Sequence, residues 1–536
     1  MPRHRLSWAI DACIALGALH FVAFVIVAIA RLRYAFDVEW MEGGELLHAV
    51  RLLQGKPIYA RPSSEFTAFF YTPLYPAAVA VLARAFGGVT YALGRGISLA
   101  STLATMSLLV AMVRREAGTR WALLALGTYA ALDRFAGTFF DVARPDALAL
   151  ALAFASAVVV RRGSRDRSGA AAALLAVLAI LTKQTMVILV AAEAAWLLAR
   201  DRRRGVVFSA LTVVLGTIAA FVLQRGSGGW FGFYVLSGHQ SHAFYWSNVF
   251  FYFWRDLLFL APLLLLLPLA WARGVAPRST WVLLAAVHVT AVFAQRALTL
   301  DYPEHMYYRE LAYESPRVLL LVPPLTIAGV LLWRRAPLEG PRSGDGYWLW
   351  MFAAALATSA VGHATQWAYK NAFLPAALFG ALFVALAARD LARQGGAAEI
   401  AVAAVFAIQL VALFDSPASR MPTASDHAKL AALRERLARV DGRVLVLAHP
   451  LLAWEHDGHT DMHQMGLSDV ALLGGVGDFE AQMARHAWTA VVTDDGDGLD
   501  VPEAVRRYYR REETLDGPWM KTGVRVHPAA LWVPGP

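Results

Sequence analysis

Four carboxylates gather in a short stretch that begins where the first apolar run of the chain ends. Asp37, Glu39, Glu42 and Glu45 lie within nine residues of one another. Acids clustered at the mouth of a membrane bundle suit either a general base or a cation site. The alternative is a solvated loop whose acids favour the start of a helix through its dipole. Composition alone leaves both interpretations open.

Histidines are the second group that could carry chemistry. The segment SGHQSHAFYWSN contains His239 and His242, an i, i+3 pair that can bind a metal. Two ligands alone are a weak signal, so we favour a loop or substrate contact. The run HDGHTDMH at 456–463 has a metal-like composition but matches no zinc template, and we interpret it as a surface loop. Neither segment by itself predicts a metal site.

These residues must be held by a membrane bundle. The chain is 58% hydrophobic and 17% charged, whereas soluble domains carry about 25% charged residues. About 20 apolar residues span a bilayer, and long apolar runs recur throughout residues 1–415. The predicted spans are about 7–30, 91–113, 119–138, 145–161, 168–182, 185–199, 205–223, 251–272, 279–297, 317–333, 346–363, 371–389 and 397–414. The pair at 168–199 is two short helices or one interrupted helix, so we predict about 11–13 transmembrane helices.

The distribution of charge predicts the orientation. The net charge is +9, and most Lys and Arg sit in short clusters between apolar runs, which indicates topology rather than nucleic-acid binding. With the N-terminus in the cytoplasm, these clusters face inside and the loops 31–90, 224–248 and 298–316 face outside. In the first of these loops, the spacing over 40–54 predicts an amphipathic helix along the membrane surface.

The tail after residue 415 has a different character. Its charge is ordinary, and it contains two β-type runs at 443–449 and 488–494 with helical patterns at 426–440 and 476–486. The predicted fold is therefore an all-α polytopic membrane bundle over 1–415 with a small soluble α/β domain over 416–536. With thirteen spans this domain lies on the outer side of the membrane, whereas an even number of spans would place it inside.

The order of motifs resembles the GT-C glycosyltransferases. An acidic residue after the first span, a helix ending in LLQGKPIY and an aromatic-rich YTPLYP are most similar to the bacterial branch near protein mannosyltransferases and aminoarabinose transferases. FDVARPDALALALA and LTKQT agree with this pattern. The resemblance covers most of the membrane part, and the order of the motifs is more specific than any one of them.

This resemblance implies a reaction on the outer face of a bacterial cytoplasmic membrane. A sugar leaves a polyprenyl-phosphate donor and joins a lipid, glycan or protein acceptor with inversion. A first-loop carboxylate acts as base, and a cation balances the departing phosphate. Carried onto this chain, the base is Asp37 or Glu39, and we slightly prefer Asp37, since many relatives have adjacent acids where this chain has Asp-Val-Glu. Glu42 is the third choice, because its helical position could also be an ordinary solvated one. The branch that the chain resembles works without an obligatory metal, so we expect no required cofactor and leave metal dependence open. Tyr71, in YTPLYP, is placed among the substrate-binding residues.

Other charged residues have two interpretations each. Asp141 or Asp146 could contact substrate with Arg144 on phosphate, or Asp146 could simply favour a helix start after Pro145. Lys183 lies between apolar runs, where a charge is expensive and often functional, although a lysine can also snorkel to the interface.

The segment HATQWAYKNAF places His363 and Lys370 near the predicted outer face. They would contact the donor phosphate, or else anchor an interfacial belt with neighbouring aromatic residues. A different class of function is a transporter or flippase for a lipid or amphiphile. Transporters are expected to show inverted repeats and mid-span ionisable residues. The sequence shows no such repeat, so we favour an interfacial enzyme.

Overall fold

The structure is a computed structural model of the 536-residue chain. It describes residues 7–164, 166–251, 256–257, 260–272, 346–393, 397–496 and 499–536. The predicted spans 279–297 and 317–333, and the loop 298–316, lie outside the described residues.

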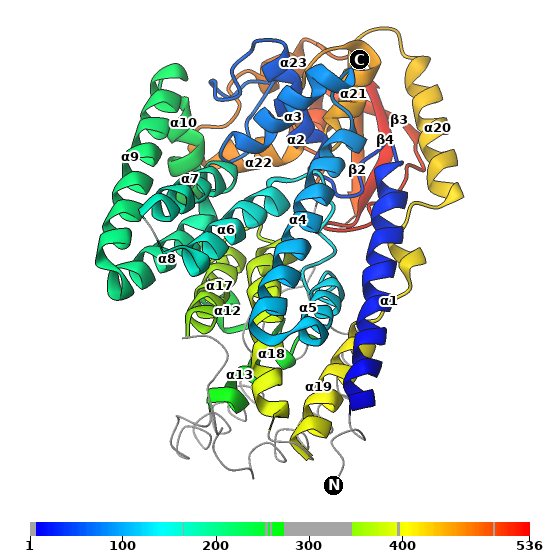
Figure 1. Cartoon of the computed structure of the whole chain (residues 1–536). Coiled ribbons are helices and arrows are strands. Elements are labelled where there is room, and N and C mark those ends of the chain that lie inside the picture. The colour runs from blue at the N-terminus through cyan, green and yellow to red at the C-terminus, as the bar shows by residue number, and fades with distance from the viewer. Residues whose placement is uncertain are drawn as a thin grey trace.

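Helices dominate the part of the chain before residue 415 (Figure 1). Apolar runs form helices in a membrane because each helix satisfies its own backbone hydrogen bonds. Among the described residues, four helical stretches are long and apolar enough to cross a membrane, or five if a bent pair at 398–438 is one span. The four are α1 (Ser7–Leu32), α4 (Tyr91–Ala117), α9 (Arg202–Gly226) and the stretch from η4 (Lys370–Phe373) through α18 (Leu374–Ala392).

The other helices of this part are shorter. Their bounds are α2 (Glu42–Leu53), α3 (Leu74–Phe86), α5 (Thr119–Ala131), α6 (Pro145–Arg162), α7 (Asp166–Thr182), η1 (Gln184–Met186), α8 (Val187–Arg200), α10 (Trp230–Gly232), η2 (Phe233–Ser237), α11 (Gly238–Ser241), α12 (Trp246–Phe251), α13 (Leu263–Ala272), α17 (Tyr347–Ala364) and α19 (Ala397–Leu413). The ambiguous pair is thus two helices, α7 and α8, separated by Lys183 and a short 3₁₀ turn.

The tail is an α/β unit, as predicted. Its four-stranded sheet has the order β1-β2-β4-β3, in which β1 and β2 are parallel and the other pairs antiparallel. The two predicted strands are β1 (Val444–Val446) and β2 (Ala490–Gly496). The sequence reading missed β3 (Tyr509–Thr514) and β4 (Val526–Pro534). The helices are η5 (Pro417–Arg420), α20 (Ala424–Ala438), α21 (Pro450–Asp457), α22 (Gln464–Val470), η6 (Ala471–Leu473), α23 (Phe479–Ala484) and α24 (Glu503–Tyr508).

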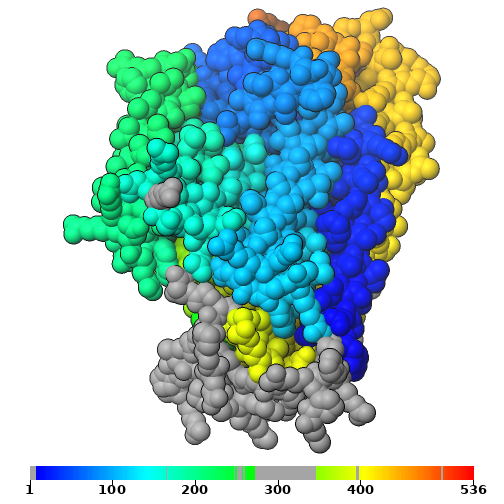
Figure 2. Space-filling model, viewed as in Figure 1, coloured from blue at the N-terminus to red at the C-terminus, as the bar shows by residue number. Residues whose placement is uncertain are grey.

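The tail packs against the first loop at the end of the bundle opposite the start of α1 (Figure 1). The backbone N–H groups of Lys521 and Thr522 both donate to the carbonyl of Val38, at 2.9 and 3.0 Å. The carbonyl of Ser64 accepts from the N–H of Met462 at 3.2 Å. In the space-filling view, the orange tail and the blue first loop meet in one surface along the top (Figure 2).

Helix α2 does not lie on the membrane surface, so that prediction is wrong. Every residue from Glu42 to Arg51 is buried. The apolar side of α2 packs with α3. At its start, Glu42 pairs with Arg95 of α4, and Gly44 lies against the ring of His463 of the tail. An amphipathic pattern shows that two faces differ, but it does not show whether the polar face meets water or buried partners.

Candidate functional site

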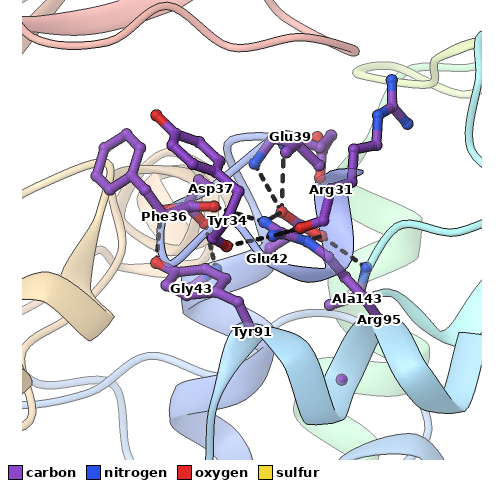
Figure 3. Close-up of polar contacts among 12 residues, drawn as sticks. Arg31, Tyr34, Phe36, Asp37, Glu39, Glu42, Gly43, Tyr91, Arg95 and Ala143 are labelled. Atoms are coloured by element: carbon purple, nitrogen blue, oxygen red, sulfur yellow. Dashed lines mark hydrogen bonds and ion pairs between the residues drawn. The ribbon is translucent and has the colours of Figure 1, made fainter. Parts of the chain in front are cut away.

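Arg95 of α4 organises the start of the first loop (Figure 3). Its guanidinium donates to both oxygens of the Glu42 carboxylate, at 2.9 and 2.5 Å. Its remaining N–H groups reach three backbone carbonyls at 2.5–2.7 Å, those of Arg31, Tyr34 and Phe36. Such bidentate pairs are strong and directional. Arg95 therefore fixes the loop to the top of α4.

Glu42 is fully occupied by this arrangement. Besides Arg95, it accepts hydrogen bonds from the backbone N–H groups of Val38 at 2.7 Å and Ala143 at 2.8 Å. Burial alone would raise the pKa of Glu42, but Arg95 together with the N–H groups of Ala143 and Val38 outweighs burial and holds the pKa below its usual range. These contacts show Glu42 joining three segments of backbone, and they leave its oxygens little capacity for a substrate.

Asp37 is completely buried and joins the first loop to the tail. Its Oδ1 accepts from the N–H of Gly43 at 2.6 Å, and its Oδ2 accepts from the Tyr91 hydroxyl at 2.8 Å. The Nδ1 of His449 lies 2.8 Å from the same Oδ2, and the Nε2 of His449 lies 2.9 Å from Asp494. Burial would lower the pKa of His449, but the two carboxylates outweigh burial and raise this pKa to about 10. His449 is therefore a buried cation between two acids.

Glu39 faces the bundle instead. Its Oε2 accepts from the N–H of Met41 at 3.2 Å and from Arg144 Nη1 at 3.0 Å. Arg144 also donates to the hydroxyl of Tyr71 at 2.7 Å. Burial raises the pKa of Glu39 to about 7, although Arg144 opposes the shift. A carboxyl group with this pKa can exchange a proton near neutral pH.

Asp146, at the first turn of α6, holds the second cation of the cluster. Lys183 Nζ lies 2.5 Å from Asp146 Oδ1, and Asn371 Nδ2 donates to the same oxygen at 3.0 Å. Arg144 Nε lies 3.6 Å from Asp146 Oδ2. Both Arg144 Nε and Asp146 Oδ2 are buried without a hydrogen-bond partner among the described residues.

The structure thus brings together five of the predicted residues, namely Glu39, Tyr71, Arg144, Asp146 and Lys183. They come from the first loop, the segment before α6, the start of α6 and the junction of α7 with α8. Two cations beside three carboxylic acids, counting Glu45 described below, make a site that can bind an anion and exchange a proton. We call this set, with Glu45 and Asn371, the Arg144 cluster.

Two predicted histidines lie at the edge of the cluster. His239 Nε2 is 2.9 Å from the carbonyl of Phe70 and contacts the side chain of Gln184, which follows Lys183. His242 Nε2 lies 3.2 Å from Asp469 of α22. The two rings lie edge to face with centroids 6.2 Å apart, and each Nε2 has its own polar partner.

The remaining predicted residues lie elsewhere. Asp141 pairs with the buried Arg31 at 2.9 Å, away from the cluster. His363 lies in the last turn of α17, and its Nε2 is 3.6 Å from Asp256. Lys370 begins η4, directly before Asn371, and packs against Gly137. Within the described ranges, no group of three or more His, Cys, Asp or Glu residues could hold a metal ion.

Sequence reasoning did not single out His449, Asp494 or Asn371. His449 ends the run RVLVLAH, and Asp494 ends the run WTAVVTD. Because β1 and β2 are parallel, polar residues at their carboxyl ends come together. The proximity of His449 and Asp494 could therefore have been predicted from the sequence. The contact between His449 and Asp37 could not, because the two residues are 412 positions apart in the chain.

Comparison with known proteins bears on the membrane part. A sequence model of the family described as dolichyl-phosphate-mannose-protein mannosyltransferase matches residues 71–225, a segment that includes Tyr71, Arg144, Asp146 and Lys183. This match supports the resemblance to GT-C membrane glycosyltransferases that the motifs predicted. None of the curated proteins compared with the chain matches it.

Among solved structures, the chain is similar to ArnT from Cupriavidus metallidurans and to an archaeal oligosaccharyltransferase. The apo ArnT structure has 15% identity, coverage of 99% of this chain and 100% of that chain, and a TM-score of 0.49. ArnT bound to undecaprenyl phosphate has 15% identity, coverage of 98% and 99%, and a TM-score of 0.46. AglB from Archaeoglobus fulgidus, in complex with an inhibitory peptide and a dolichol-phosphate, has 12% identity, coverage of 89% and 69%, and a TM-score of 0.42.

Proposed function

We propose that this chain is a GT-C-type glycosyltransferase that moves a sugar from a polyprenyl-phosphate donor to an acceptor. The observation that carries the proposal is the ion pair between Glu39 and Arg144, 3.0 Å long, beside the Lys183–Asp146 pair. It places a proton acceptor next to two cations where the first loop meets several helix ends. In a bilayer, the donor's lipid tail would stay among the helices while its phosphate reached these cations. We place the reaction on the extracytoplasmic side of a bacterial cytoplasmic membrane, as the basic clusters predict.

In this mechanism, the acceptor oxygen attacks the anomeric carbon of the sugar and inverts its configuration. The carbon–oxygen bond to the phosphate breaks, and the electron pair leaves with the polyprenyl phosphate. The proton of the acceptor passes to Glu39. Arg144 and Lys183 balance the charge that develops on the phosphate, which is how preorganised cations accelerate group transfer.

Between the two acids implied by the resemblance, we propose Glu39 as the base. The oxygens of Asp37 are engaged by Gly43, Tyr91 and His449. The hydrogen bonds to Glu39 described above all end on Oε2. A carboxylate with a pKa of about 7 is matched to proton transfer near neutral pH, while Asp37 ties the loop to the tail.

The test is transfer from radiolabelled polyprenyl-phosphate sugars to envelope extract by the purified full-length protein, with and without a chelator. Glu39→Gln should lower kcat by about 10²–10⁴-fold, the usual contribution of a general base. Glu65→Gln, which changes an exposed acid of the same loop, should have no effect. The wild-type rate should rise as the pH increases through about 7, because Glu39 must lose its proton first.

Two failures have different meanings. If Glu39→Gln keeps more than about a third of the activity, the base assignment is wrong. If the wild-type protein neither transfers any lipid-linked sugar nor binds undecaprenyl phosphate, the glycosyltransferase proposal is wrong, and movement of a lipid across vesicles becomes the activity to measure.

A further inference from the structure

Glu45 is a buried acid that the proposed mechanism does not use. It lies on α2, about one turn after Glu42, and is 2% exposed. Its Oε1 is buried and has no hydrogen-bond partner within the described part of the chain. Buried polar groups in native proteins are nearly always partnered, so an exception of this kind points to an absent ligand or a chemical role.

The surroundings of Glu45 are the Arg144 cluster. The groups that act on it electrostatically come from three other segments of the chain, and they are Arg144, Asp146, Glu39 and Lys183. Glu45 in turn acts electrostatically on the phenols of Tyr59, Tyr71 and Tyr75. Asp469 of the tail acts on Tyr71, and His48 and Arg51 are the other titratable groups on α2 itself. Arg144 Nη1 lies 2.9 Å from the sulfur of Met41, and the backbone N–H of Glu45 bonds to the carbonyl of Met41, so Glu45 lies one helical turn from a residue that Arg144 contacts.

The charges of the cluster decide whether an anion can enter. Arg144 and Lys183 contribute two positive charges, while ionised Glu39, Glu45 and Asp146 would contribute three negative ones. That fully ionised cluster has a net charge of −1 and would repel a phosphate, and each proton added to a glutamate removes one negative charge. Burial raises the pKa of Glu45 to about 8. Arg144 lowers this pKa, whereas the negative charges of Asp146 and Glu39 raise it further.

We propose that Glu45, in its protonated form, is a phosphate ligand of this site. Its carboxyl O–H would donate a hydrogen bond to a phosphate oxygen of the polyprenyl-phosphate ligand, next to Arg144 and Lys183. Loss of that proton converts the donor into a second acceptor and adds a negative charge, so the ionised form does not bind. The inference rests on the proposed function, since it names a further residue and a proton requirement for the same ligand.

The experiment measures binding of undecaprenyl phosphate to the full-length protein in nanodiscs at pH 7.5, 8.5 and 9.5. The second pKa of a phosphate monoester is about 6, so the charge of the ligand is constant over this range. If only the protonated form binds, a pKa of about 8 makes the wild-type Kd rise about 25-fold from pH 7.5 to 9.5. Glu45→Gln keeps an N–H donor and cannot ionise, so the Kd of this variant should vary less than about threefold between pH 7.5 and 9.5.

Control measurements separate the outcomes. Glu65→Gln should follow the wild-type profile, because Glu65 is exposed. A wild-type Kd that does not vary with pH, or a Glu45→Gln profile as steep as that of the wild type, overturns the role of Glu45. Wild-type protein that binds no undecaprenyl phosphate at any pH overturns the proposed function instead.

A second measurement does not depend on how well the variant folds. Calorimetric titration of the wild-type protein at pH 8.5, in buffers with different ionisation enthalpies, gives the number of protons taken up on binding. A site with a pKa of about 8 that must be protonated takes up about 0.8 proton per ligand at this pH. An uptake of zero overturns the proposal.

Discussion

The contact between Asp37 and His449 makes the docking of the tail sensitive to a single side chain. His449, Asp37 and Asp494 have side chains that are 0% exposed, and both ring nitrogens of His449 are within 2.9 Å of a carboxylate oxygen. Replacing His449 with Ala leaves two carboxylates buried without their cation. Breaking a buried ion pair by removing one partner costs about 3–5 kcal/mol.

The pKa of His449 points in the same direction. The two carboxylates raise it to about 10, so the folded state favours the charged form. Because the folded-state pKa is raised, this stabilisation is complete below about pH 6.5 and is lost as the pH rises through about 10.

Hydrogen–deuterium exchange of the full-length protein measures this effect locally. The relevant amides are those of Lys521 and Thr522, which bond to the carbonyl of Val38 across the interface. For His449→Ala, their exchange should accelerate by about two to four orders of magnitude, the equivalent of 3–5 kcal/mol in the opening free energy. The matched control is His459→Ala, since the His459 side chain is 60% exposed and its ion pair contributes little. Acceleration of less than tenfold in His449→Ala would refute the reasoning.

Three further predictions concern the loop and the cluster. Glu42→Gln should lower the thermal stability of the purified protein strongly, by about 3–5 kcal/mol, because Arg95 would remain buried without its anion; an unchanged melting temperature contradicts this. Gly44→Ala should lower both stability and transfer, because an added Cβ would lie 2.5 Å from the Phe69 ring, and circular dichroism melting with the transfer assay detects both effects. Lys183→Met should raise the KM for the donor by at least tenfold with a smaller change in kcat if Lys183 binds the phosphate in the ground state, and steady-state kinetics would show the reverse if it acts only in the transition state.

Local hydropathy predicted the positions of most elements. The first span, predicted at 7–30, is α1 at Ser7–Leu32, and the span predicted at 145–161 is α6 at Pro145–Arg162. A long apolar run must form a helix in lipid whatever lies around it, so its prediction needs no tertiary information. The prediction for 119–138 was too long, since α5 ends at Ala131 and Thr138 adopts a positive φ of 61° in the turns that follow.

The missed strands have a different cause. In β3, Tyr509 is buried and the five residues after it are exposed, so the strand has no alternating apolar pattern. β3 belongs to the sheet because it pairs with β4. The sequence analysis predicted only β1 and β2, so the partner strand β4 was not predicted either. Strand formation of this kind depends on a partner rather than on the segment alone.

The sequence by itself determined which residue types were present for the chemistry and that they lie at the ends of apolar helices, because charged side chains are expensive inside a membrane. Only the tertiary structure decided which charge meets which. Glu42 is held by Arg95, Asp37 by His449, and Glu39 by Arg144, across separations of 53, 412 and 105 residues. The role of each acid follows from its partner and its burial, since these decide whether the carboxyl group holds a proton, and neither property can be read from a single position in the chain.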